Sequence, residues 1–119
     1  MPKAGPRLSI RIDLPGGVRF GPGKAALLTA IGELGSLAAA ARSLSMSYPR
    51  ALKLVDDMNA GFPEPLVEKQ HGGAGRGGSA LTATGRHVLD LYRSICDTAG
   101  TATAAQRNEL VRLIGRPKH

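Results

Sequence analysis

Three polar side chains, Tyr48, Arg50 and Lys53, lie on one side of a helix that the sequence predicts over residues 47–59. Arginine can donate two hydrogen bonds to O6 and N7 of guanine, whereas lysine and tyrosine reach phosphates or base edges. The other side of this helix is apolar, with Ala51, Leu54, Val55 and Met58 at helical spacing. We therefore predict one packed face and one face that contacts DNA. An ordinary polar helix face is the alternative.

A shorter helix is predicted directly before it. Ser36 is an N-cap residue type, and residues 45–47 form a turn in which Ser47 caps the following helix. Pro49 is tolerated in the first turn of that helix, where the backbone N–H has no helical partner. The core face of the shorter helix is carried by Leu37, Ala40, Ala41 and Leu44. Two helices joined by a tight turn indicate a helix-turn-helix, whose second helix enters the major groove. A helical hairpin inside a core is the competing interpretation.

Further candidate DNA contacts flank the two helices. Arg42, near the end of the shorter helix, is a candidate phosphate clamp. Ser36 and Ser47 are expected to cap their helices, to contact phosphate through the helix N-termini, or to do both. Pro49 belongs to the same first turn and is included in the predicted interface.

A basic, glycine-rich loop between two short strands follows the helix-turn-helix. Residues 66–70 and 80–82 are the strand candidates, and residues 71–79 form the loop between them. This arrangement is typical of a wing, which lies along the sugar-phosphate backbone or enters the minor groove. The expected phosphate contacts in the loop are Gly75, Arg76 and Gly77.

The same loop matches G-x-G-x-x-G over residues 73–78, the pattern of a dinucleotide-binding site. That site needs a strand before the glycines, a long helix directly after them and a surrounding βαβ unit. Here a short apolar strand and residues 82–85 follow the glycines instead of a long helix. Catalysis has little support either. His71, His87 and His119 are dispersed, and the neighbouring Asp56 and Asp57 diverge by about 100° on a helix, which disfavours a catalytic dyad. We expect these two residues to set the boundary of the DNA-facing surface or to pair with nearby Lys or Arg. We therefore expect no enzyme, no metal site and no cofactor.

Composition narrows the choice of partner. The chain has 119 residues, of which 42% are hydrophobic. Its formal net charge is +7, and this positive charge points to a polyanionic partner such as DNA, RNA or an anionic membrane surface. No signal peptide or membrane-length apolar run is present, so we expect no membrane association. A single cysteine, Cys96, excludes an internal disulfide and suits a small buried residue in a cytoplasmic protein.

The remaining chain divides into three predicted regions. Residues 1–7 form a flexible arm, residues 8–99 a winged helix-turn-helix domain, and residues 100–119 a C-terminal helix with a basic tail. Within the domain we expect a hairpin over residues 8–20 and a helix over residues 24–34 with Leu27, Leu28, Ile31 and Leu34 in the core. Glycine and proline at residues 61–65 end the second helix of the helix-turn-helix. Two more helices are expected, from residue 82 or 84 to 97 and over residues 102–114, with a weak segment at 97–101.

Several motifs of the chain resemble one known family. They are GPGK (21–24), GSLAAAAR (35–42), MSYPRA (46–51), LVDDMN (54–59) followed by PEPLVE (63–68), and LTATG (81–85). From about residue 8 to residue 93 the chain is similar to the N-terminal winged-helix domain of ModE-type molybdate-responsive transcriptional regulators. The helix-turn-helix alone is also similar to that of LysR-type regulators.

The resemblance implies a dimeric, promoter-binding domain. Matching positions place Ser47, Tyr48, Arg50 and Lys53 on the recognition helix and residues 72–79 in the wing. Ser45 departs from the glycine that such turns often have. Full-length members carry a molybdate-binding C-terminal region for which the 119-residue sequence has no room, so we expect no molybdate or tungstate cofactor. Dimerisation would fall to apolar residues of the terminal helices, namely Val88, Leu91, Tyr92, Ile95, Leu110 and Ile114.

We conclude from the sequence that the chain is mainly α-helical with a small β wing (α+β), a winged helix-turn-helix with an N-terminal β-hairpin and C-terminal dimerisation helices. The expected partners are double-stranded DNA and a second copy of the chain, and a separate sensor protein is a further candidate. The expected function is sequence-specific regulation of transcription. The alternative is a winged-helix module that binds another protein without specific DNA recognition.

Overall fold

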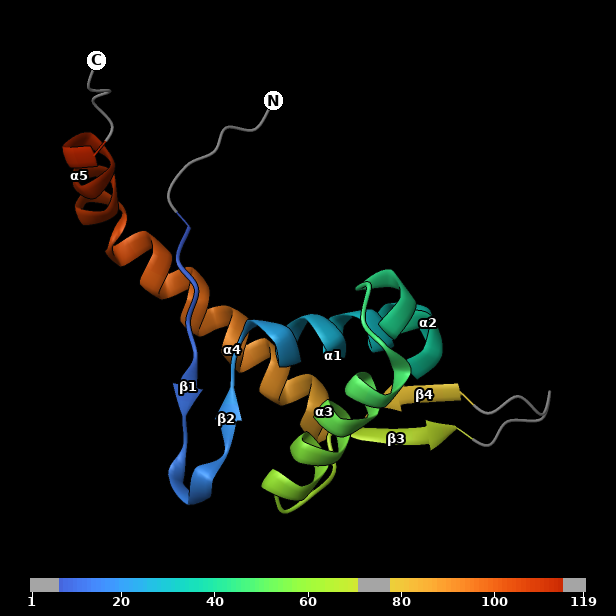
Figure 1. The fold of residues 1–119 in the computed structure, drawn as a ribbon. Helices are drawn as coiled ribbons and strands as arrows, with labels where there is room; N and C mark the ends of the chain where they lie inside the picture. Colours follow the sequence, from blue (N-terminus) through green and yellow to red (C-terminus); the bar gives the residue numbers. More distant parts are fainter. Residues whose placement is uncertain (1–6, 71–77, 115–119) are drawn as a thin grey trace.

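The computed structural model describes residues 7–70 and 78–114, and Figure 1 shows their arrangement. A small hairpin leads into three helices, a two-stranded antiparallel sheet and a long C-terminal helical arm. The predicted α+β class and winged architecture are confirmed. Within these residues, no helix combines the length and the apolar character that crossing a membrane requires.

The hairpin pairs β1 (Ile12–Asp13) with β2 (Arg19–Phe20) through a turn at Pro15–Gly17. Gly16 and Gly17 both have positive φ, 81° and 82°, which glycine adopts without steric cost. The strands are shorter than predicted, because α1 already begins at Pro22 and leaves residues 8–11 no strand to pair with. A proline at the first helical position loses no hydrogen bond, which explains the start two residues before the predicted one.

Three helices form the centre of the fold. They are α1 (Pro22–Leu34), α2 (Leu37–Ser43) and α3 (Tyr48–Gly61). Leu27, Leu28 and Ile31 of α1 are completely buried, as predicted. Leu34 was wrongly assigned to the core: it is the last residue of α1, the chain turns away at Gly35 (φ 73°), and its side chain is 48% exposed. α3 continues two residues beyond its predicted end.

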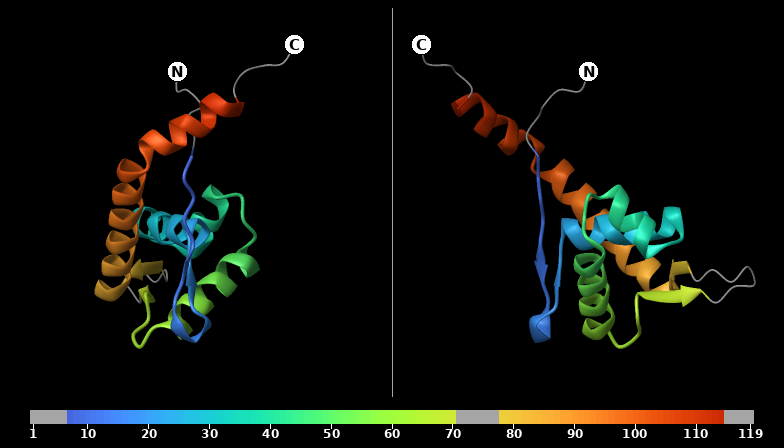
Figure 2. Two further views of the ribbon diagram at one scale, coloured as in Figure 1. Left: turned by 90° about the vertical axis from the view of Figure 1, so that its left-hand side faces the viewer. Right: turned by 45° about the vertical axis from the view of Figure 1, so that its right-hand side comes forward.

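The C-terminal arm consists of α4 (Ala83–Ala102) and α5 (Ala104–Ile114). The prediction that the helix weakens at residues 97–101 is wrong, because α4 continues through them. An interior glycine costs only about 1 kcal/mol relative to alanine, and Gly100 alone is not enough to end a 20-residue helix. The break falls instead at Thr103. Figure 2 shows that α5 lies at the far end of α4 from the two-stranded sheet, and none of its residues is buried.

Candidate nucleic-acid interface

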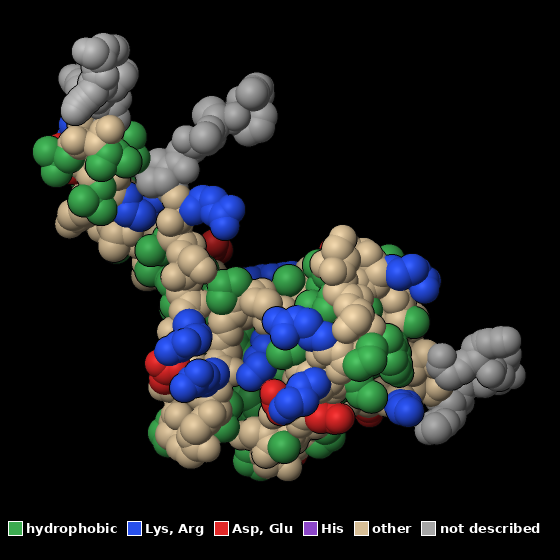
Figure 3. Space-filling model, in the orientation of Figure 1, with side chains coloured by type: hydrophobic (Ala, Val, Ile, Leu, Met, Phe, Trp, Pro, Cys, Tyr) green, Lys and Arg blue, Asp and Glu red, His purple; other side chains and the backbone are tan. Residues whose placement is uncertain are grey.

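The outer face of α3 is exposed, as the sequence predicted. Tyr48 is 49% exposed, and Arg50 and Lys53 also lie open to solvent. The opposite face packs into the core through Ala51, Val55 and Met58, which are all buried. Lys and Arg side chains are spread over the face of the molecule seen in Figure 3. The helix therefore presents a basic surface that no other described element covers.

Two serines fix where the helices of the helix-turn-helix begin. The Ser36 hydroxyl accepts a hydrogen bond from the Ala39 amide at 3.0 Å, and the Ser47 hydroxyl accepts one from the Arg50 amide at 3.2 Å. Both predicted caps are confirmed. A typical N-cap contributes about 1 kcal/mol, and it also orients the N–H groups of the first turn.

The turn between α2 and α3 depends on a left-handed residue. Ser45 has φ 56°, a conformation that glycine adopts more easily. The Met46 amide donates to the Ala41 carbonyl at 2.9 Å, and the Ser45 amide donates to the Arg42 carbonyl at 3.1 Å. These bonds stabilise the turn around Ser45, so the turn forms without a glycine at this position.

Lys53 forms an ion pair with Asp57 one turn along α3, at 2.9 Å. The pairing that we predicted for the acidic residues is thus confirmed for Asp57. Both side chains are largely exposed, so the ion pair is weak and can exchange for another anion. Arg42 and Arg50 have no ion-pair partner among residues 7–70 and 78–114, and both are exposed. Arg42 lies in the last turn of α2.

The two-stranded sheet forms the predicted wing. β3 (Val67–Gln70) pairs with β4 (Gly78–Leu81) in antiparallel register, with Val67 opposite Leu81. β3 begins one residue later than predicted and β4 two residues earlier. The loop candidates Gly75, Arg76 and Gly77 lie outside the described residues, as does His71.

The wing is attached to the start of the helix-turn-helix. The Ser79 amide of β4 donates a 2.9 Å hydrogen bond to the carbonyl of Gly35, the residue that follows α1. A Cβ added to Gly78 would lie 2.7 Å from the same carbonyl oxygen, so glycine is needed for this close approach. This contact was not predicted, and no short-range pattern in the sequence indicates it.

A small cleft of about 200 Å³ lies where the wing meets the two helices of the helix-turn-helix. Two predicted interface residues, Ser36 and Tyr48, line it together with Lys69 of β3 and Ser79 of β4. Lys69 was not among the predicted contacts, and Ser79 was predicted only as part of the wing loop. The side of the sheet on which a strand residue lies can be told only once the register is known. The cleft therefore joins three hydroxyl groups and a lysine from the N-cap of α2, from α3 and from both strands of the wing.

Tyr92 belongs to the hydrophobic core of the chain. Its ring packs edge-on against Phe20 at a centroid distance of 5.1 Å, and its hydroxyl donates to the Ile10 carbonyl at 2.6 Å. Burial, with a smaller contribution from the neighbouring Cys96, raises the pKa of Tyr92 to about 12. Of the other proposed dimerisation residues, Val88 is half-buried, and four are exposed: Leu91, Ile95, Leu110 and Ile114.

Metal-ligating side chains do not gather in the part of the chain that the structure describes. No three His, Cys, Asp or Glu side chains there lie close enough to hold a metal ion. His87 is exposed on α4, and Cys96 is a free, half-buried thiol.

Three helices with a tight turn between the last two, followed by an antiparallel wing and a long helix, define a winged helix-turn-helix domain. Residues 24–86 match the family model of the bacterial regulatory helix-turn-helix proteins of the lysR family. The match covers more than half of the chain, and the chain belongs to this family.

The curated relatives agree with the predicted ModE resemblance. The chain is 40% identical over 79 residues to the molybdenum-pterin-binding protein MopB of Rhodobacter capsulatus, covering 66% of this chain and 29% of MopB. It is 37% identical over 89 residues to the molybdenum transport protein ModE of Azotobacter vinelandii, covering 75% of this chain and 32% of ModE. The chain thus spans less than a third of the length of these relatives.

Solved structures support the same fold. The DNA-binding domain of CbnR in complex with DNA is 28% identical, with a TM-score of 0.57, and the match covers 74% of this chain and 95% of that domain. Full-length CbnR, a LysR family transcriptional regulator, matches with 29% identity and a TM-score of 0.54 over 71% of this chain and 28% of CbnR.

Proposed function

We propose that this protein is a sequence-specific, double-stranded-DNA-binding transcriptional regulator that acts as a homodimer. The observation that carries the proposal is the outer face of α3. This face is basic and exposed, its helix begins at a capped N-terminus, and the turn at Ser45 connects that helix to α2. A helix of this kind fits the major groove of B-DNA.

Base recognition would come from Arg50 and Tyr48, near the N-terminal end of α3. Arg50 has no ion-pair partner among the described residues, so its guanidinium can bind a guanine edge without first breaking an ion pair. Lys53 would contact DNA by exchanging Asp57 for a phosphate, at little cost because the ion pair is exposed.

Phosphate binding would position the domain on the duplex. The cleft lined by Ser36, Tyr48, Lys69 and Ser79 offers hydroxyl donors and one ammonium group at the junction of the wing and α2. Arg42 and the loop residue Arg76 would add contacts on either side. These groups supply salt-dependent affinity and fix the register of α3, but they do not distinguish sequences.

Dimerisation would use the exposed apolar residues of the C-terminal arm, above all Leu91, Ile95, Leu110 and Ile114. A two-fold axis would then place two copies of α3 on half-sites about one helical turn apart. Tyr92 is buried within the protomer, so it would pack behind this surface and not contact the second copy directly.

A band-shift assay across a salt series tests the proposal. The protein should bind DNA from upstream of its own gene more tightly than the same DNA scrambled, and both affinities should fall as salt rises. Equal affinity for both sequences at every salt concentration would remove the claim of sequence specificity.

The exposed apolar surface of α5 favours one second candidate, a module that binds another protein. Light scattering of the pure protein separates the two functions. A stable dimer that discriminates between DNA sequences supports the regulator, and a monomer without discrimination supports the protein-binding module. We expect no molybdate or tungstate binding by this chain, which isothermal calorimetry with either oxyanion would test.

A further inference from the structure

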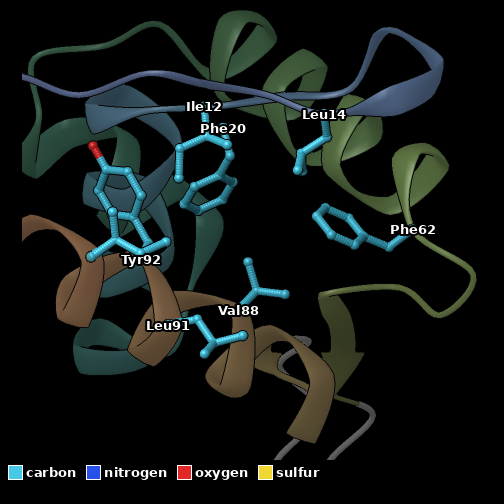
Figure 4. Close-up of a pocket in the computed structure, with 8 residues that line it drawn as sticks. Ile12, Leu14, Phe20, Phe62, Val88, Leu91 and Tyr92 are labelled. Atoms are coloured by element: carbon cyan, nitrogen blue, oxygen red, sulfur yellow. The ribbon is translucent and has the colours of Figure 1, made fainter.

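The N-terminal hairpin has one apolar face and one charged face. Figure 4 shows the side chains of Ile12 and Phe20 between the hairpin and α4, where they line an apolar groove. Neighbouring side chains of a strand point to opposite faces. Arg11, Asp13 and Arg19 therefore lie on the face turned away from α4, and their side chains are 57%, 60% and 65% exposed.

This outer face carries more positive than negative charge. Asp13 lies opposite Arg19 in the antiparallel register, and two guanidinium groups share its carboxylate. Arg11 Nε lies 3.1 Å from the carboxylate and Arg19 Nε lies 3.7 Å from it. Two positive charges against one negative charge leave one positive charge in excess. Because these ion pairs are exposed they are weak, and the arginines can exchange the carboxylate for another anion.

Lys24, in the first turn of α1, adds a further positive charge beside the hairpin. Its ammonium group donates to the Arg19 carbonyl at 2.7 Å, which holds it next to β2. An ammonium group has three N–H donors, so two remain for a ligand. Across residues 7–70 and 78–114, no carboxylate lies within ion-pair distance of Lys24. We call Arg11, Arg19 and Lys24 the basic hairpin cluster.

A cleft of about 490 Å³ lies between the hairpin turn and the end of α3. Arg19 and Lys24 line it on one side, and Asp57 of α3 lines it on the other. Asp57 is already paired with Lys53 at 2.9 Å, so its charge is balanced from outside the cleft. The lining of the cleft therefore stays positive and suits an anionic group.

This cleft and the wing lie on opposite sides of α3. Tyr48 lines the cleft at the wing, and Asp57 lines the cleft at the hairpin. The two residues are nine positions apart, which at 3.6 residues per turn places them about 180° apart around the helix. Figure 3 shows Lys and Arg side chains over the hairpin and over α3 on one face of the molecule. The basic surface of α3 therefore continues onto the hairpin.

We propose that the basic hairpin cluster binds the phosphodiester backbone of DNA on the side of α3 opposite the wing. The inference rests on the DNA binding of the proposed function and adds a contact outside the helix-turn-helix and the wing. Both strands of the hairpin precede residues 24–86, which the lysR family model matches. Arginine and lysine donate charge-assisted hydrogen bonds to phosphate oxygens, and such contacts carry no sequence information. The hairpin thus contributes affinity and orientation to DNA binding, and α3 contributes specificity.

The salt dependence of DNA binding tests the cluster. Arg19→Gln and Lys24→Gln each remove one positive charge, and glutamine at position 24 keeps a donor for the carbonyl of residue 19. On a scrambled duplex, each variant should lower the slope of log affinity against log salt by about 0.9, and the double variant by about 1.8. Affinity for DNA from upstream of the gene should fall by the same factor as affinity for the scrambled duplex.

Arg112→Gln, on α5, is the matched control for the loss of one positive charge and should leave the slope unchanged. A double hairpin variant with the slope of the wild type would overturn the proposal. That result is also the one expected if the cluster binds an acidic protein segment instead of DNA.

A gain of binding provides a second, independent test, because a damaged hairpin would not produce it. Asp13→Asn removes the carboxylate that Arg11 and Arg19 share, and affinity for any duplex should rise at least about threefold at low salt. Asp97→Asn, on α4, removes the same charge away from the cluster and should change affinity much less. Equal effects of the two variants, or weaker binding by Asp13→Asn, would overturn the proposal.

Hydroxyl-radical footprinting on the upstream DNA locates the contact. The wild type should protect the backbone on both sides of the segment that α3 binds. Arg19→Gln/Lys24→Gln should lose protection on one side, and Lys69→Ala, in the wing, should lose it on the other. Loss of protection on the same side by both variants would overturn the placement of the hairpin opposite the wing.

The two proposals can fail separately. A wild-type protein that discriminates DNA sequences, with a double hairpin variant of unchanged slope, retains the regulator function and loses the hairpin contact. A wild-type protein that binds all duplexes equally, with a lowered slope in the hairpin variants, retains the hairpin contact and loses sequence specificity. A wild-type protein that binds no duplex at low salt loses both.

Discussion

Asn59, near the end of α3, is hydrogen-bonded to Val67, the first residue of β3, in the manner of a neighbouring strand. Its side-chain oxygen accepts from the Val67 amide at 3.1 Å and its side-chain nitrogen donates to the Val67 carbonyl at 3.1 Å. The same oxygen accepts from the Leu66 amide at 2.8 Å. One side chain therefore connects α3 to the first strand of the wing.

Replacing Asn59 with alanine should loosen that connection. Asn59→Ala leaves the Leu66 and Val67 amides without their partner, and we expect the free energy of unfolding to fall by about 1–3 kcal/mol. Urea unfolding measures this change. Asn108→Ala, at an exposed position on α5, is the matched control and should change stability by less than about 0.5 kcal/mol. Equal stability of the two variants would contradict a structural role for Asn59.

Gly85 in the first turn of α4 has no room for a side chain. A Cβ there would lie 2.1 Å from the Leu66 carbonyl oxygen, which is a backbone atom that cannot move independently. Gly85→Ala should therefore destabilise the fold by about 3 kcal/mol or more. Gly23→Ala is the control, since a Cβ at Gly23 meets nothing within 4 Å and alanine favours the helix. Thermal unfolding should show a lower midpoint for the first variant only.

Arg50 and Lys69 should affect DNA binding in different ways. Arg50→Ala should reduce discrimination at one base position by about 1–3 kcal/mol, because it removes a base contact. Lys69→Ala should weaken binding to all sequences alike and lower the slope of log affinity against log salt by about 1, because it removes a phosphate contact. Arg112→Ala, on α5, is the control for the loss of one positive charge. A sequence-dependent effect of Lys69→Ala would contradict its assignment to phosphate.

Tyr92 should make stability fall at high pH. Its pKa is about 12 in the folded protein against 10.0 for the free side chain, so between these values the unfolded chain releases a proton that the folded chain keeps. Ionisation then favours the unfolded state, and the stabilisation present below pH 10 is lost as the pH rises toward 12. Urea unfolding at pH 8 and pH 11 should show this loss for the wild type and a smaller loss for Tyr92→Phe. Tyr48→Phe, on the exposed face of α3, is the control. The same loss in Tyr92→Phe as in the wild type would assign the effect to other groups.

The sequence determined the features that depend on residues close together in the chain. The N-caps at Ser36 and Ser47, the apolar face of α3 and the wing strands arise from local spacing and local hydrogen bonds, and the structure confirms them. The lysR-type helix-turn-helix could be predicted for the same reason, since its two helices and turn occupy one continuous stretch of the chain.

Tertiary structure decided which of the predicted surfaces remained exposed to solvent. Tyr92 and Leu91 are neighbours on α4, yet the hairpin covers Tyr92 and leaves Leu91 exposed, because the hairpin contacts only one side of the helix. Lys69 lines the same cleft as Ser36 and Tyr48. The Ser79 amide brings the wing to this place by donating to the Gly35 carbonyl, which lies 44 residues away in the chain. Such contacts depend on how distant elements pack, and helical or strand periodicity carries no information about distant packing.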